Sequence, residues 1–119
     1  MKSKAELIRT IEKAFETRNA KRQMILVGTA LSRLLENQTS DEVAMETTQD
    51  ANGVGFSGAD GEIGTSMAKF YLNRGFLTPK QVAYWMKPTG KAQRPRILKY
   101  RAQLAEFAKR KQRRQLSNA

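Results

Sequence analysis

The chain has 119 residues, with 22 Lys and Arg against 11 Asp and Glu, which gives a formal net charge of +11 at pH 7. It contains no cysteine and no histidine, so disulfides and thiolate metal sites are excluded, and the usual general base and commonest metal ligand are missing. We therefore expect one domain with a modest core, no conventional active site and no cofactor.

The N-terminal part of the chain predicts helix. Ser3 and Glu6 form a capping-box pattern just ahead of an apolar rhythm with helical spacing. A second apolar run begins at Met24 and ends at Leu35. Because no proline separates the two runs, they form either one bent helix or two helices joined near Asn19.

The middle of the chain is polar, acidic and rich in glycine. Residues Thr39, Ser40 and Asp41 can cap a short helix that ends near Glu46. The glycines that follow, between Gly53 and Gly58, indicate irregular backbone. This segment is therefore predicted to be a connector.

Two helices are predicted next. Asp60 is expected to be the N-cap of the first, whose apolar face is Ile63, Met67, Phe70 and Tyr71, and Gly75 stands where a left-handed C-terminal cap is expected. Thr78 and Gln81 form a second capping box, and Pro88 must end the short helix that follows.

The last predicted helix begins near Arg94-Pro95. Its apolar residues Ile97, Tyr100, Leu104 and Phe107 recur at helical spacing, and its basic end, Lys109 to Arg114, is expected to fray into solvent. No segment alternates with period two for long, so the predicted fold class is all-α: a small bundle of about five helices with an acidic, glycine-containing connector.

We expect one domain overall, made of four regions. These are an N-terminal helical region (1–36), an acidic connector (37–60), a basic helical module (61–108) and a basic flexible tail (109–119). The longest apolar runs, near Met24 to Val27, are far shorter than the ~20 residues of a membrane span. Charges interrupt the apolar stretch that a signal peptide would need after Met1, so we expect a cytoplasmic protein with no membrane partner.

Three motifs in the connector have weak catalytic or binding interpretations. Gly53 to Gly58 matches G-x-G-x-x-G, but no strand precedes it, so a turn is favoured over a dinucleotide site. A calcium-loop pattern that starts at Asp50 has Val54 and Gly61 where oxygen ligands are needed. Six acids can in principle hold Mg²⁺ for nuclease chemistry, but a solvated segment, or an internal partner for the basic half, is favoured; they are Asp41, Glu42, Glu46, Asp50, Asp60 and Glu62.

Charge is distributed very unevenly along the chain. Residues 63–119 carry fourteen Lys and Arg and one acid, Glu106, whereas residues 37–62 carry six acids and no base. A half-chain this basic attracts polyanions, of which nucleic acid is the commonest in a cell. The candidate phosphate contacts are Lys69, Arg74, Lys80, Lys87, Lys91, Arg94, Arg96, Lys99 and Arg101, and the candidate stacking rings are Tyr84 and Trp85, while Phe70 and Tyr100 are expected in the core.

Several motifs also stand in a characteristic order. Asn52 to Asp60 reads N-G-x-G-F-x-x-x-D, Leu77 to Gln81 reads L-T-x-K-Q, and Lys99 to Leu104 reads K-Y-x-x-Q-L. This order resembles a segment of small phage and prophage helical proteins of DNA metabolism. It is similar to the accessory helical hairpin of UvsW-type phage recombination helicases. The resemblance covers about residues 36–105, and the Pro88–Pro95 loop departs from its spacing. It implies a helical module that works with DNA or with DNA-handling machinery.

Two functions from different classes remain open. The leading hypothesis is a non-enzymatic, nucleic-acid-binding phage protein of the host-cell cytoplasm that prefers single-stranded or branched DNA. The alternative is a protein-interaction factor that docks on a host or phage DNA-processing enzyme and inhibits or recruits it. A metal-dependent nuclease is the weakest hypothesis, and RNA stays open as the nucleic acid.

Overall fold

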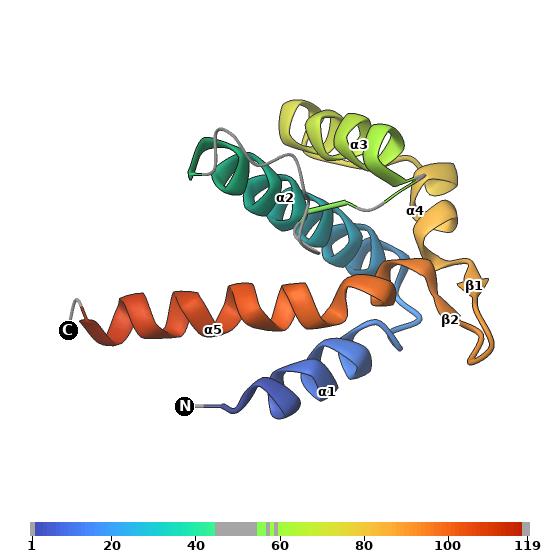
Figure 1. The fold of residues 1–119 in the computed structure, drawn as a ribbon. Helices are drawn as coiled ribbons and strands as arrows, with labels where there is room; N and C mark the ends of the chain where they lie inside the picture. The colour runs from blue at the N-terminus through green and yellow to red at the C-terminus, as the bar shows by residue number, and fades with distance from the viewer. Residues whose placement is uncertain (1, 45–54, 57, 59, 118–119) are drawn as a thin grey trace.

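The computed structural model describes residues 2–44, 55–56, 58 and 60–117. Within them the chain forms five α-helices, one short 3₁₀ helix and one two-stranded hairpin (Figure 1). In chain order these are α1 (Lys4–Ala14), α2 (Ala20–Ala44), α3 (Asp60–Arg74), α4 (Pro79–Met86), β1 (Pro88–Thr89), β2 (Arg94–Pro95), η1 (Arg96–Tyr100) and α5 (Arg101–Ser117). The predicted all-α bundle of about five helices is confirmed.

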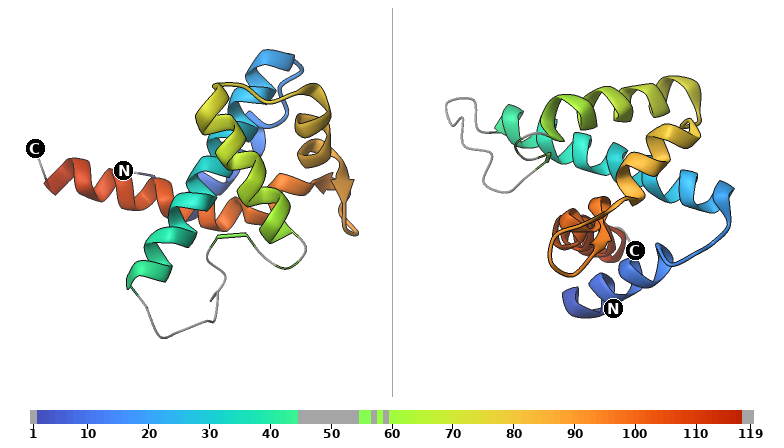
Figure 2. Two further views of the ribbon diagram at one scale, coloured as in Figure 1. Left: turned by 90° about the horizontal axis from the view of Figure 1, so that it is seen from above. Right: turned by 90° about the vertical axis from the view of Figure 1, so that its right-hand side faces the viewer.

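The helices stack in layers around α2 and α5. Helix α5 lies between α1 on one side and α2 on the other, so the two ends of the sequence pack together (Figures 1 and 2). Helix α3 covers the opposite side of α2, and α4 packs against both α2 and η1. The last turns of α5 extend beyond the other helices (Figures 1 and 2).

Local capping explains where the N-terminal helices begin. The Ser3 side chain accepts a hydrogen bond from the Glu6 backbone N–H, and the Ser3 N–H donates to the Glu6 carboxylate, so the predicted capping box is present. At the joint, the Asn19 side-chain oxygen accepts from the Arg22 N–H at 2.9 Å. The chain therefore forms two helices rather than one bent helix.

The same local chemistry sets the bounds of α3 and α4. Gly75 has a φ of +79°, and its N–H donates to the Tyr71 carbonyl at 2.8 Å, which is the expected left-handed helix end. The second predicted capping box forms between Thr78 and Gln81, with Pro79 in the first turn. Helix α4 ends at Met86, two residues before Pro88, as predicted.

The core is one cluster shared by every layer. Trp85, Leu31, Leu34, Ile97 and Val27 are its largest fully buried apolar side chains. The predicted inward stripe of the last helical segment is buried throughout, at Ile97, Tyr100, Leu104 and Phe107. The spacing of apolar residues therefore predicted this part of the core correctly.

Two helices run further than expected. Helix α2 continues without a break to Ala44, so the prediction of a separate helix capped by Thr39, Ser40 and Asp41 is wrong, and the boundary at residue 36 lies inside a helix. Helix α5 continues to Ser117, so Lys109 to Arg114 do not fray. In both cases the extension follows an already formed helix, whose propagation is favourable, and neither residues 37–44 nor residues 109–117 contain proline or glycine.

Helix α3 buries most of the predicted face, since Met67, Phe70 and Tyr71 are partly buried against the core, but its fully buried positions are others. Asp60, Gly64 and Ala68 are buried, whereas Ile63 is 39% exposed and Phe70 is only half-buried. Small residues lie on this face because they allow Phe56 to approach the helix closely: a Cβ on Gly64 would lie 2.4 Å from the ring of Phe56. The periodicity of large apolar residues therefore found most of the inner face but missed its small, fully buried residues.

The chain between α4 and α5 is more structured than a loop. Pro88 pairs with Pro95 and Thr89 with Arg94 in a small antiparallel hairpin, and the Arg96 N–H donates to the Lys87 carbonyl at 3.0 Å. A 3₁₀ turn follows, so α5 begins at Arg101 rather than near Pro95. In the part of the chain that the structure describes, no helix has the length and apolar content to cross a bilayer.

Candidate nucleic-acid interface

The predicted phosphate contacts are distributed over several elements. Lys69 and Arg74 lie on α3, Lys80 on α4, Lys87 at the C-terminal end of α4, Lys91 and Arg94 in the hairpin, Arg96 and Lys99 on η1, and Arg101 at the start of α5. Lys69, Arg74, Lys80, Lys87 and Lys91 are exposed. The structure brings together the last four predicted cations, Arg94, Arg96, Lys99 and Arg101, which we call the η1 cations.

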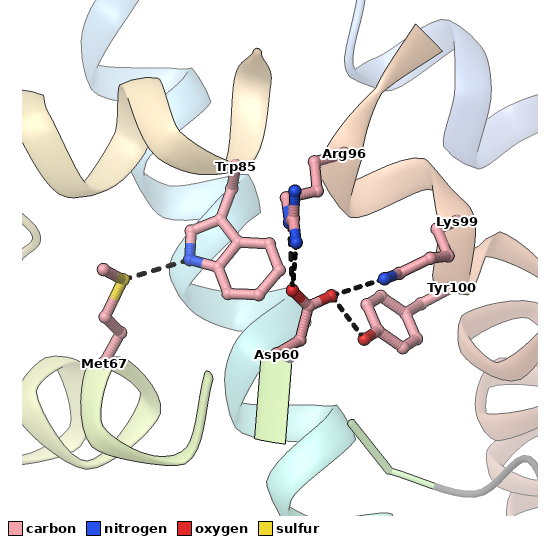
Figure 3. A network of polar contacts seen from close by, with 6 residues as sticks. All are labelled: Asp60, Met67, Trp85, Arg96, Lys99 and Tyr100. Carbon is pink, nitrogen blue, oxygen red and sulfur yellow. Dashed lines mark hydrogen bonds and ion pairs between the residues drawn. The ribbon is translucent and has the colours of Figure 1, made fainter. Parts of the chain in front are cut away.

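Asp60 binds two of the η1 cations. Its carboxylate accepts from Arg96 at 2.7 and 2.9 Å, from Lys99 at 2.7 Å and from the Tyr100 hydroxyl at 2.7 Å (Figure 3). The Asp60 side chain is 0% exposed. The helix α3 begins at Asp60 itself, so the prediction that this residue is an N-cap outside the helix is corrected: its carboxylate faces η1.

The protonation states follow from these contacts. Burial alone would raise the pKa of Asp60, but hydrogen bonds from Lys99, Tyr100 and Arg96 outweigh burial and hold that pKa below its usual range. For Lys99, burial alone would lower the pKa, but the hydrogen bond to Asp60 and the electrostatic attraction of Tyr100 and Asp60 together outweigh burial and raise the pKa. The cluster is therefore an anion held between cations, with little tendency to exchange protons near neutral pH.

Glu12 forms ion pairs with the other two η1 cations. Its carboxylate lies 3.8 Å from Arg94 and 3.5 Å from Arg101. Glu12 is on α1, and this helix packs along α5. All four η1 cations therefore have an acidic partner within the protein.

Of the two predicted stacking rings, Trp85 is enclosed in the core and Tyr84 is partly exposed. Trp85 is fully buried, its indole N–H points at the Met67 sulfur at 3.1 Å, and Phe56 packs 6.0 Å from it, so the prediction that Trp85 stacks on a base is wrong for this structure (Figure 3). Trp85 fills the junction of α3, α4 and η1, where its large apolar area is most effective. Tyr84 is half-buried, with the Arg96 guanidinium 4.9 Å from its ring centroid.

A second cationic group lies where sequence reasoning expected a frayed tail. Lys109, Arg110, Lys111, Arg113 and Arg114 all project from the last turns of α5, and we call them the α5 cationic end. Among the described residues, no acid lies within ion-pair distance of Lys109, Lys111 or Arg114, whereas Arg113 contacts Glu106 at 3.3 Å. The signal that could have found this group was the unbroken run of helix-forming residues after Arg101.

Helix α2 adds to the α5 cationic end. Arg33 lies 5.3 Å from the centroid of the Phe107 ring, and Lys111 lies 5.6 Å from the same ring. Arg110 donates to the Asn37 side-chain oxygen at 2.9 Å. No local sequence signal links Arg33 to this group, because only the packing of α2 on α5 brings it there.

A small cavity sits between α2 and this part of α5. It has a volume of about 60 Å³ and is bordered by Glu36, Asn37, Phe107, Arg110, Lys111 and Arg114. This is room for a few water molecules. Because Phe107 is buried, the surface presents charged groups rather than an open aromatic face.

The motifs of the family-like pattern contact one another. The Gly55 N–H donates to the Gln103 side-chain oxygen at 2.7 Å, and the Gln103 amide donates back to the Gly55 carbonyl at 3.0 Å. The rings of Phe56 and Tyr100 pack edge to face with centroids 6.0 Å apart. Since Asp60 also binds Tyr100, the N-G-x-G-F-x-x-x-D and K-Y-x-x-Q-L motifs hold each other in place, which is a structural role.

The remaining connector motifs receive little structural support. Most of the G-x-G-x-x-G and calcium-loop residues, and the side chains of Asp41, Glu42, Glu46 and Asp50, lie outside the described residues. Among the described residues, no group of three or more His, Asp or Glu is placed to hold a metal ion. Of the six candidate acids, Asp60 is paired with cations and Glu62 is exposed.

Comparison with known proteins adds no relative. No family model, no curated protein and no solved structure matches this chain. The functional argument therefore depends on the geometry of the two cationic groups.

Proposed function

We propose that the protein is a non-enzymatic nucleic-acid-binding protein that contacts phosphates through the α5 cationic end and Arg33. The observation that carries this proposal is the excess of unpaired charge: these six cations border two acids, Glu106 and Glu36, and among the described residues only Arg113 of the six has an acid within ion-pair distance. Such an excess binds a phosphate chain with release of condensed counterions.

The proposed contact is with the backbone of the nucleic acid and not with its bases. The cations lie on a helix that extends past the bundle, and the nearby ring, Phe107, is buried. Phosphate contacts position a protein without reading sequence. The preference for single-stranded or branched DNA, the role in phage DNA metabolism and the host-cell cytoplasm come from the family resemblance and the composition, and they are part of the proposal.

A salt titration tests the proposal directly. Binding to single-stranded, duplex and forked DNA is measured by fluorescence anisotropy between low and moderate salt. If ~5 cations contact phosphates, log K falls with log salt with a slope near −3.5 for a single strand. A flat salt response, or no binding at low salt, contradicts the proposal.

A protein-interaction factor is the second candidate function. It is favoured by large apolar side chains that remain exposed at the end of α3 and just after it, Leu72 at 61% and Phe76 at 44%. In this case the basic surface would meet an acidic surface of a DNA-processing enzyme. Pull-down from nuclease-treated lysate distinguishes the two, because partners retained without nucleic acid favour the protein-interaction role.

A further inference from the structure

An open apolar groove lies between the start of α2 and α4. It has a volume of about 420 Å³, and its apolar lining includes Met24, Leu77, Pro79, Val82 and Met86. This volume is within the range of sites that take a ligand or a few side chains of a partner. The groove is separate from the α5 cationic end, with which it shares no residue.

The groove has the walls of a helix-binding site. Pro79, Val82, Ala83 and Met86 recur along one face of α4, and Leu77 is buried beneath them. The opposite wall comes from the first turns of α2, with Ala20 and Met24. Two flexible methionines allow such a surface to adapt to different apolar side chains.

The charge around the groove has one sign. Both walls come from stretches without any acid, since none occurs between Glu16 and Glu36 or between Glu62 and Glu106. Lys21 lines the groove, and Lys80 and Lys87 are exposed on the α4 face that also carries Ala83. Within the described residues, none of these three lysines takes part in an ion pair.

We infer that this groove binds an acidic, amphipathic segment of a partner protein. Apolar side chains of the segment enter between Met24 and Met86, and its carboxylates face Lys21, Lys80 and Lys87. This is the helix-in-groove mode of recognition with an electrostatic rim. A nucleic acid does not fit the apolar lining, and a second copy of this chain would bring a net charge of +11 to a surface that is already basic.

Selection from a random peptide library tests the inference. Peptides of about 12 residues, long enough for three helical turns, are selected on the immobilised full-length chain. The expected consensus combines Asp or Glu with Leu, Ile, Met or Phe at helical spacing. No enrichment, or a consensus that is basic or lacks large apolar residues, overturns the inference.

Matched variants place the binding site. Ala83→Glu fills the groove and adds a repelling carboxylate on an exposed helical position, so affinity for the selected peptide falls at least about tenfold. Ala5→Glu makes the same change on exposed α1 and leaves affinity unchanged. Circular dichroism of both variants confirms that each is folded. Equal binding by wild type and Ala83→Glu, or competition for the peptide by self-association, overturns the inference.

Peptide binding to the groove can be separated from nucleic-acid binding by a competition experiment. Saturating single-stranded DNA should leave peptide affinity within about twofold at moderate salt, since the two surfaces share no residue and exposed charges are screened. Complete displacement of the peptide by DNA shows that the groove belongs to the nucleic-acid surface and overturns the inference.

Discussion

The η1 cations and the α5 cationic end differ in what faces them, although the sequence makes both look alike. The η1 cations surround Asp60 and Glu12, at distances of 2.7 to 3.8 Å. At the α5 cationic end, the only ion pair within it among the described residues is that of Arg113 with Glu106. A high local density of Lys and Arg therefore does not by itself define a binding surface, because acids far away in the sequence can form ion pairs with these side chains and neutralise them.

The difference has an energetic basis. A phosphate that approached Arg96 or Lys99 would compete with a fully buried carboxylate, and separating a buried ion pair leaves an uncompensated charge. Among the described residues, no carboxylate is paired with Lys111 or Arg114, so a phosphate that approaches them competes with none of these acids. We therefore assign the larger part of the proposed binding to the α5 cationic end.

The largest expected effect comes from removing three cations of that end that have no acid within ion-pair distance among the described residues. The triple variant Lys109→Ala, Lys111→Ala and Arg114→Ala should lower affinity for single-stranded DNA on the order of 100-fold at low salt and reduce the salt slope by about 2. Fluorescence anisotropy at several salt concentrations measures both quantities. The control, Lys69→Ala, Lys80→Ala and Lys87→Ala, removes the same charge elsewhere. If it weakens binding equally, net charge and not this surface determines affinity.

The next largest effect concerns the stability of the η1 region. Asp60→Asn should lower the free energy of unfolding by about 2 kcal/mol, because it leaves Arg96 and Lys99 without their carboxylate but partly able to reach solvent. Urea unfolding at pH 7 measures this difference. Glu62→Gln, an exposed change in the same helical turn, should stay within about 0.5 kcal/mol of wild type. An Asp60→Asn variant that is fully stable and binds DNA more tightly would contradict the assignment of binding to the α5 cationic end. It would show that Asp60 keeps the η1 cations from binding DNA.

The stabilising contribution of Asp60 should also depend on pH, with a smaller effect than the substitution itself. The folded pKa of Asp60 is lowered from about 3.9, so its contribution is complete above about pH 4 and is lost as the pH falls through the folded value. The pKa of Lys99 is raised from about 10.4, so its contribution is complete below that pH and is lost as the pH rises through the folded value. Urea unfolding from pH 3 to 8 should therefore show a gap between wild type and Asp60→Asn that closes toward acid. A gap independent of pH would mean that Asp60 acts through packing and not through its charge.

The smallest expected effect tests whether α2 extends the α5 cationic end. Arg33→Ala should reduce the salt slope for single-stranded DNA by about 0.7, the share of one phosphate contact. Arg22→Ala removes an exposed cation from the start of the same helix and should leave the slope unchanged. An equal effect of the two substitutions would show that Arg33 has no special position.

The buried side of the candidate site could be anticipated only in part. The helical spacing of Ile97, Tyr100 and Leu104 predicted a buried stripe, and all three are in the core. Trp85 is predicted as a stacking ring because aromatic residues are interleaved with Lys and Arg in this half of the chain, and that pattern does not show which rings other helices cover. The layers contributed by α3 and η1 decide that Trp85 is enclosed.

What the sequence by itself determined is the local architecture: the capping boxes at Ser3 and Thr78, the left-handed end at Gly75 and the helical character of the chain. These features depend on groups within one or two helical turns, so their spacing along the chain is their spacing in space. Which cations remain available was decided by tertiary structure alone, because Asp60 meets Arg96, and Arg33 meets Phe107, only after distant helices have packed. Electrostatic pairing depends on distance through space, and a linear count of charges does not contain that distance.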